Sequence, residues 1–505
     1  MSTSERFEKL LDQFTPALLA LLMVYAFARS VAAGTGKGYW LDELLTQLVT
    51  SQQSISKIMS ALRAPIDGQP PLFYMIEDLA SRLVANQDIA LRLPAALGLV
   101  CTILCVYIFL RRQSGRLIAL LSTAFLMTTA AWLYAEEARP YSMVVGCISL
   151  ALVCYQRAPS PKWMVLLGAS LALAQSLHYL AVLSFVPFGL AELEESLRTK
   201  KVRWGVWSAL AVGVLPLLLF WNLLALNKAY YGAYHAALGY NFARAVHAYG
   251  DLLITDGPVG MGIAVTAAVG LAIARRNPPR EPDHSQPSGR ENERILIAGL
   301  LGLPFIAYVF VLATHAPMAS RYFLPGVLGF PLSIGFTLAR LPRQAVLFFA
   351  AYLLTTVGVT EMHFWRYIAA GRTDLANQGI ATAKFIASAG HPQLPIVVPS
   401  GDILWVVRYA FPDSPGRFVY LTKDQDGPNN TTDKSLTNAQ RYAPIQVRRA
   451  SDFIGANPTF LIYDGAGSPA QWLISQVLRE GCSVELLAAD GNRAVYLVQK
   501  PRPGN

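Results

Sequence analysis

Two adjacent carboxylates follow the first long apolar run of the chain. Asp42 and Glu43 stand in the stretch Trp40-Leu41-Asp42-Glu43-Leu44-Leu45. Neighbouring residues of a helix point about 100° apart, so both carboxylates cannot face one substrate atom. We therefore expect one to act as a catalytic base and the other to support it. The alternative is a helix start at a membrane interface, where acids favour the helix dipole.

Two arginines stand in short connections next to apolar runs. Arg139 follows Glu136 and Glu137 in a tight connection between apolar runs, and Arg321 precedes Tyr322 at the start of another run. A guanidinium group binds phosphate through two parallel hydrogen bonds, so we predict a phosphate clamp. The alternatives are a loop ion pair between Glu137 and Arg139, and an Arg321 that reaches lipid phosphates.

Composition excludes an ordinary soluble protein. Of the 505 residues, 53% are hydrophobic and only 15% are charged, whereas soluble chains carry about 25% charged residues. The apolar content also excludes disorder for most of the chain. The predicted class is a polytopic α-helical membrane protein, because lipid offers no partner for open backbone groups. Eleven apolar runs, each predicted to span the bilayer, lie near 15–33, 91–110, 117–133, 141–156, 163–177, 179–192, 204–226, 258–274, 295–314, 322–339 and 344–360.

Basic residues predict the orientation of these spans. Lys and Arg gather in alternate short loops, which places the N-terminus in the cytoplasm. The formal net charge of +10 therefore reflects topology, and no nucleic-acid partner is expected. The inner set comprises Arg6, Lys9, Arg111, Arg112, Arg116, Arg157, Lys162, Arg198, Lys200, Lys201, Arg203, Arg275, Arg276, Arg280, Arg290, Arg294, Arg340 and Arg343.

The chain divides into a membrane domain, 1–360, and a C-terminal domain, 361–505, of soluble character. Apolar runs that read as strands alternate in the second domain with helical stretches, and 484–498 reads as a hairpin. We predict a small α/β domain on the exoplasmic or periplasmic side. Two further outer segments are expected, an amphipathic one at 35–90 and a loop rich in Tyr and His at 227–257.

Several short motifs in this order resemble the GT-C glycosyltransferases. The closest branch contains the protein O-mannosyltransferases and the lipid A aminoarabinose transferase, and the resemblance covers about residues 15–340. The motifs are Leu41-Asp42-Glu43, Gln69-Pro70-Pro71-Leu72-Phe73-Tyr74, Glu136-Glu137-Ala138-Arg139-Pro140-Tyr141-Ser142 and Ser320-Arg321-Tyr322-Phe323-Leu324-Pro325.

The resemblance implies an inverting transferase that takes sugar from a polyprenyl-phosphate donor on the exoplasmic face of the cell membrane. Asp42 would be the base with Glu43 beside it, and Arg139 and Arg321 would hold the donor phosphate. The acceptor would be a lipid, a glycan or a protein. Many relatives carry His where this chain has Gln69, so the role of that position differs here.

Other residues are expected to line the substrate site. No His/Asp cluster has the spacing of a metal site, so no metal ligands are assigned, although a divalent cation near Asp42 is compatible with the mechanism. The lining candidates are Glu136, Glu137, Tyr141, Gln69, His178, Tyr179, Lys228 and Tyr322.

Two other functions fit a polytopic chain. A transporter or flippase typically shows repeated halves and ionisable groups in mid-span, whereas the notable charges here stand at span ends and no repeat is visible. A lipid-linked ligase or assembly protein would use the outer domain for binding and the membrane part as an anchor.

The topology can be tested with reporter fusions. A reporter fused after Arg116 should be active in the cytoplasm, and one fused after Lys500 should be active outside, because the basic loops alternate between the two faces. Paired alkaline phosphatase and fluorescent protein fusions measure both positions. Any other pattern contradicts the predicted orientation.

Overall fold

The computed structural model describes residues 3–158, 160–238, 240–253, 290–316, 318–369, 375–423, 431–465, 471–491 and 493–501. Packing divides the chain into two units, and each is made of segments that are distant in sequence. The helical unit comprises Met1–Thr35, Gln69–Ala225 and His235–Ala370. The sheet unit comprises Gly36–Gly68, Leu226–Tyr234 and Gly371–Asn505.

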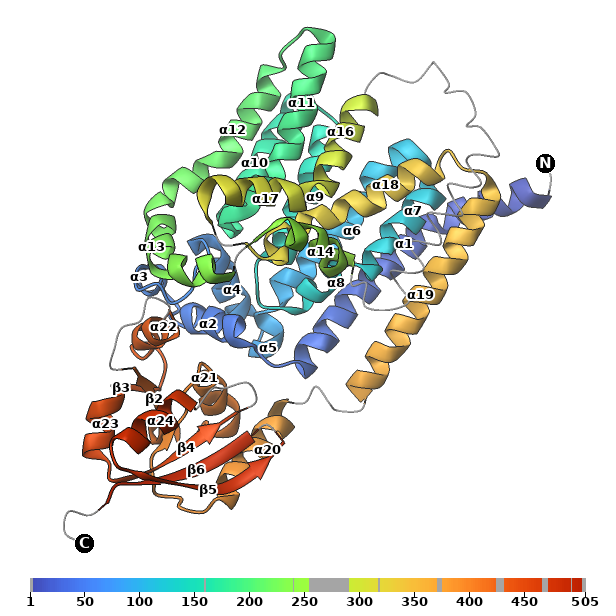
Figure 1. Ribbon diagram of the computed structural model, residues 1–505. Coiled ribbons are helices and arrows are strands. Elements are labelled where there is room, and N and C mark those ends of the chain that lie inside the picture. Colours follow the sequence, from blue (N-terminus) through green and yellow to red (C-terminus); the bar gives the residue numbers. More distant parts are fainter. Residues whose placement is uncertain are drawn as a thin grey trace. The chain divides into compact units, whose positions relative to one another are not determined.

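The helical unit is a bundle of long and broken helices (Figure 1). Among the described residues, three helices are long and apolar enough to cross a membrane, and three bent helix pairs raise the number to six when each pair counts as one span. The predicted run at 258–274 lies outside the described residues. The elements of the helical unit are α1 (Thr3–Gly36), α4 (Pro71–Leu83), α5 (Gln87–Ala90), α6 (Leu93–Ser114), α7 (Arg116–Ala124), η1 (Phe125–Thr128), α8 (Ala130–Leu133), η2 (Tyr134–Glu136), α9 (Tyr141–Tyr155), α10 (Pro161–Leu177), η3 (Tyr179–Phe185), α11 (Val186–Thr199), α12 (Trp204–Leu219), α13 (Trp221–Leu238), which continues into the sheet unit, α14 (Phe242–Leu253), α16 (Arg290–Leu301), α17 (Leu303–Thr314), η4 (Ser320–Leu328), α18 (Gly329–Leu338) and α19 (Arg343–Ala369).

Helices α6 and α9 approach each other closely through two glycines. A Cβ atom on Gly98 would lie 2.7 Å from the Ser142 carbonyl oxygen, and one on Gly146 would lie 2.8 Å from the Gly98 carbonyl oxygen. Small residues allow helix backbones to meet at such distances in membranes. The Ser142 hydroxyl also donates to the Ala95 carbonyl at 2.8 Å. The start of α9 is therefore fixed against α6.

The segment expected as a Tyr-rich loop is largely helical, which corrects that prediction. Residues 227–238 continue α13, and α14 covers 242–253. The Tyr249 hydroxyl donates to the Leu301 carbonyl at 2.6 Å, and the Tyr240 hydroxyl donates to the Pro304 carbonyl at 3.3 Å. These carbonyls flank the 62° bend between α16 and α17. Both tyrosines therefore hydrogen-bond to backbone at a helix break.

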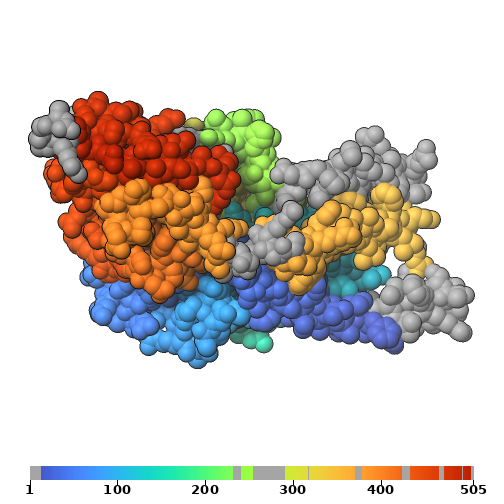
Figure 2. Space-filling view, turned by 90° about the horizontal axis from the view of Figure 1, so that it is seen from below, coloured from blue at the N-terminus to red at the C-terminus, as the bar shows by residue number. Residues whose placement is uncertain are grey.

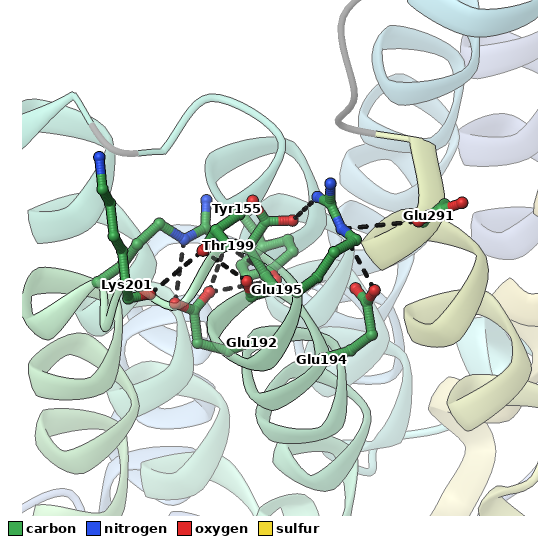
Figure 3. Close-up of polar contacts among 9 residues, drawn as sticks. Tyr155, Glu192, Glu194, Glu195, Thr199, Lys201 and Glu291 are labelled. Carbon is green, nitrogen blue, oxygen red and sulfur yellow. Dashed lines mark hydrogen bonds and ion pairs between the residues drawn. The ribbon is translucent and has the colours of Figure 1, made fainter.

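Ion pairs join α11 with α16 and with the segment before α12, and Tyr155 of α9 joins them through hydrogen bonds (Figure 3). Glu192 is fully buried; its carboxylate accepts from both Arg203 Nε, at 3.0 Å, and Arg203 Nη2. The Tyr155 hydroxyl donates to the same carboxylate at 3.3 Å. Arg198, a second residue of the predicted inner set, pairs with Glu194, Glu195 and Glu291.

Helices α1 and α19 run side by side along the helical unit (Figures 1 and 2). They are the first and last helices of this unit in sequence. Polar side chains join them directly, among them Tyr25 of α1 and Glu361 of α19 at 2.5 Å.

The sheet unit contains a six-stranded mixed sheet in the order β3-β2-β1-β4-β6-β5. The first four strands are parallel, and β6 pairs antiparallel with both β4 and β5. Its elements are α2 (Leu41–Thr50), α3 (Ile55–Arg63), α20 (Leu375–Ser388), β1 (Ile396–Val397), α21 (Ile403–Trp405), η5 (Val406–Ala410), η6 (Pro415–Arg417), β2 (Phe418–Thr422), α22 (Thr431–Ala439), β3 (Gln446–Arg449), α23 (Ala450–Ala456), β4 (Thr459–Asp464), α24 (Gln471–Arg479), β5 (Ser483–Asp490) and β6 (Arg493–Gln499).

The core of the sheet unit lies between the sheet and the helices α23 and α24. Val397, Val419 and Ile462 from the central strands pack with Phe453 and Leu473 from these helices. The structure places β1, β2 and β4 at apolar runs that the sequence predicts as strands, and β5 and β6 at the predicted hairpin; it adds the short edge strand β3. Residues 36–68 pack with the C-terminal residues, as the hydrogen bond from the Tyr39 amide to the Tyr409 hydroxyl at 3.1 Å shows.

Candidate active site

Arg139 is held in the short connection between η2 and α9. Its side chain is buried, with an exposed fraction of 3%, and its amide donates to the Glu137 carbonyl at 2.7 Å. Pro140 and Tyr141 follow directly and begin α9. Because α9 is fixed against α6 by Gly98 and Ser142, the position of Arg139 depends on that helix contact.

The structure brings Arg321 to the same place. Arg321 stands at the start of η4, and its Nε donates to the Tyr141 hydroxyl at 3.1 Å. The Arg139 guanidinium carbon lies 5.9 Å from the centroid of the Tyr141 ring. Two arginines 182 residues apart in sequence (321 minus 139) thus contact one tyrosine.

His178 completes this cluster from the end of α10. Its ring centroid lies 5.4 Å from that of Tyr141 and 5.2 Å from that of Tyr322. Burial, together with the charges of Arg139 and Arg321, lowers the pKa of His178 to about 3. The imidazole is therefore neutral at physiological pH. Its Nδ1 accepts from the Leu180 amide at 3.1 Å, which places the proton on Nε2.

Further polar atoms lie close to this cluster. The Tyr134 ring contacts that of Tyr141 edge to face, with the ring centroids 5.3 Å apart. The charges of Glu137, Arg321 and Asp251 all lie close enough to shift the pKa of the Tyr134 hydroxyl. The Tyr179 hydroxyl is buried and has no hydrogen-bond partner within the described part of the chain. Such a group is available to a ligand. We name Tyr134, Tyr141, His178, Tyr322 and the two arginines the arginine cluster.

Sequence reasoning missed the contributions of Asp251 and Arg29. Asp251 stands on α14 as an ordinary exposed acid, and nothing in its local sequence distinguishes it. Arg29 interrupts the first apolar run, and an arginine within a span is a signal of function by itself. It pairs with Glu136, one of the predicted lining residues. The Glu137 side chain is half-buried.

The two predicted catalytic acids have different environments in the sheet unit. Glu43 is fully buried, and its carboxylate accepts from the Trp40 amide at 3.2 Å, which closes the first turn of α2. Asp42 is half-exposed. The Thr46 hydroxyl donates to the Asp42 carbonyl at 3.1 Å and lies 3.3 Å from the buried Asp67 carboxylate. Of the pair, Asp42 is the residue that is partly exposed to solvent.

Two other residues that are predicted to line the substrate site, Gln69 and Lys228, lie outside the arginine cluster. Gln69 is buried in the helical unit, and its backbone amide donates to the Tyr74 hydroxyl at 3.3 Å. Lys228 is exposed on the part of α13 that packs with the sheet unit. Among the described residues, no group of three or more His, Cys, Asp or Glu side chains could hold a metal ion.

Comparison with known proteins identifies the fold. Residues 68–221 match the family model described as dolichyl-phosphate-mannose-protein mannosyltransferase. Among curated proteins no sequence matches. The structure of ArnT from Cupriavidus metallidurans in the apo state is similar with a TM-score of 0.56 at 14% identity, over 95% of this chain and 97% of that chain. The same protein bound to undecaprenyl phosphate gives a TM-score of 0.45 at 16% identity, with the same coverage.

These matches confirm the predicted fold class and the resemblance stated from the sequence. ArnT is a lipid A aminoarabinose transferase of the GT-C fold, and the apo form aligns with nearly the whole of this chain, including the sheet unit. This protein therefore has the GT-C glycosyltransferase fold of multi-pass membrane proteins, and its residues 68–221 match the mannosyltransferase family model.

Proposed function

We propose that this protein is a membrane glycosyltransferase that moves a sugar from a polyprenyl-phosphate donor to an acceptor hydroxyl on the exoplasmic face, with inversion at the anomeric carbon. The convergence of Arg139 and Arg321 on Tyr141 carries this proposal. The family model that matches residues 68–221 names a polyprenyl-phosphate sugar, dolichyl-phosphate-mannose, which supports the donor class.

The arginine cluster has the electrostatics of an anion site. Both guanidinium groups disfavour the protonated form of His178, so their positive potentials add at that point. Two like charges brought together in a partly buried site repel each other, and a phosphate between them removes that cost. A neutral His178 adds an Nε2 proton as a further hydrogen-bond donor.

The chemistry needs positive charge where the donor bond breaks. The sugar C1–oxygen bond breaks, its electron pair leaves with the polyprenyl phosphate, and arginines stabilise the developing charge. The aromatic faces of Tyr141 and Tyr322 offer stacking surfaces for a sugar. No general acid is required, because a phosphate ester oxygen is a good leaving group once it is neutralised.

Asp42 is the proposed base. It takes the proton of the acceptor hydroxyl as the acceptor oxygen bonds to C1. Direct attack opposite the leaving phosphate inverts the anomeric carbon. The capping bond of Glu43 fixes the first turn of α2 and thereby the backbone that carries Asp42. A divalent cation beside Asp42 stays a prediction, which loss of transfer in a chelator and its recovery with Mg²⁺ or Mn²⁺ would support.

Substitution of Asp42 tests the base. D42N should lower transfer by about 10²-fold or more, because general base catalysis contributes about that much, while the protein stays folded in the membrane. Complementation of a deletion strain, with mass spectrometry of surface glycolipids and glycoproteins, measures transfer. D88N, at a partly exposed acid in the first turn of α5, is the control. Normal product with D42N contradicts the base assignment.

Substitution of the two arginines tests the phosphate clamp. R139K and R321K should each weaken binding of undecaprenyl phosphate by about tenfold or more, because a hydrogen bond to a charged group is worth about 1.5–3 kcal/mol and lysine cannot form the two parallel bonds. Native mass spectrometry of the purified protein measures the dissociation constant. R82K, at an exposed arginine of α4, should bind like the wild type. Unchanged binding in both cluster variants refutes the clamp.

The pH profile tests the state of His178. With a pKa of about 3, below the usual value of about 6.5, His178 should contribute no step to kcat/KM between pH 5 and 8. Because the folded pKa is depressed, the stability that neutral His178 contributes is present above about pH 6.5 and falls as pH decreases toward 3. H178N should therefore lower activity without changing the profile's shape. A step near pH 6.5 that H178N removes contradicts this prediction.

A further inference from the structure

A buried ion network joins three elements of the helical unit. Arg29 of α1 pairs with Glu136 of η2 and, through Nε at 2.9 Å, with Glu361 of α19. The Tyr25 hydroxyl donates to the same Glu361 oxygen at 2.5 Å, and Trp365 Nε1 donates to the Tyr25 oxygen at 2.9 Å. Side chains of Arg29, Glu136 and Glu361 are only 5%, 7% and 11% exposed.

Aromatic rings enclose the guanidinium group. Its central carbon lies 3.6 Å from the Phe364 ring centroid and 4.8 Å from the Trp132 ring centroid. Rings at the faces leave the edges of the planar group for hydrogen bonds. Those edges point to carboxylates on two different elements, so the geometry of Arg29 fixes η2 relative to α1 and α19. A lysine has the charge but not the fork that reaches both carboxylates.

The network holds one end of the connection that carries Arg139. Glu136 is the last residue of η2, and α9 begins at Tyr141, so only residues 137–140 lie between them. The other end is fixed by the contact of Ser142 and Gly146 with α6. A connection of four residues with both ends fixed has little freedom. Arg139 stands within it.

We propose that Arg29 is a positioning residue for the donor site: it holds Glu136 so that Arg139 stays beside Tyr141 and Arg321, in the place that the donor phosphate occupies. The inference rests on the proposed function for the identity of the ligand, and on the network alone for the order of the 137–140 connection. Arg29 acts through Glu136 and Arg139 and does not contact the phosphate. Glu361 keeps Arg29 in place from α19.

Three variants test the proposal against a matched control. R29K and E361Q should weaken undecaprenyl phosphate binding by about tenfold, since small displacements of binding groups have effects of this order or larger, and should speed hydrogen–deuterium exchange in 134–141. R203K alters another arginine that pairs with a buried glutamate, Glu192. It should lower the melting temperature without changing either property. In R29K/R139K the effect on binding should be smaller than the product of the single effects, because both act through Arg139.

Each outcome distinguishes a positioning role of Arg29 from a purely structural one. Faster exchange in 134–141 with weaker binding in R29K and E361Q supports the proposal. A lower melting temperature with unchanged exchange and binding overturns it and leaves Arg29 a purely structural residue. If the wild type binds no undecaprenyl phosphate, the proposed function fails, and the exchange measurement still decides whether Arg29 orders the connection. If R29K does not fold, E361Q decides the proposal by the same measurements.

Discussion

The close contact between α6 and α9 is the constraint on which the donor side of the structure depends. Backbone atoms meet at Gly98 and Gly146, and any side chain there would overlap the facing helix. This contact sets the first turn of α9, where Tyr141 receives the hydrogen bond from Arg321. In lipid, helices gain no hydrophobic energy from meeting, so close packing and hydrogen bonds must hold them together. The arrangement of two cations around one ring follows from that contact.

Buried arginines of the helical unit have two kinds of surroundings. Where helices meet each other, arginines are neutralised by carboxylates, as Glu192 neutralises Arg203 and Glu136 and Glu361 neutralise Arg29. In the arginine cluster, burial together with the charges of Arg139 and Arg321 keeps the His178 imidazole unprotonated. A site at which the potentials of two arginines add is suited to an anionic ligand.

The sequence allowed the fold class, most strands and the residue types of the site to be predicted, because apolar runs and turn residues are local signals. It could not show that Arg139, His178 and Arg321 converge, since no local pattern records contacts between distant segments. Strand β3 escaped notice because Gln446 to Arg449 is polar, as an edge strand can be. The tyrosines near α14 looked like loop residues, whereas their hydroxyls hydrogen-bond to carbonyls at a helix break.

The discontinuous sheet unit has a consequence for the order of synthesis. Its first segment, with Asp42, is made before the helical unit is half complete, yet its packing partners include Tyr409 and Tyr442, which are made near the end. Contacts between such distant residues form late, because a long chain must be closed to make them. A ribosome that stalls before Tyr409 therefore leaves a helical bundle whose residues 36–68 lack the C-terminal residues with which they pack. Quality control at the membrane would then meet an incomplete sheet unit together with a complete helical bundle.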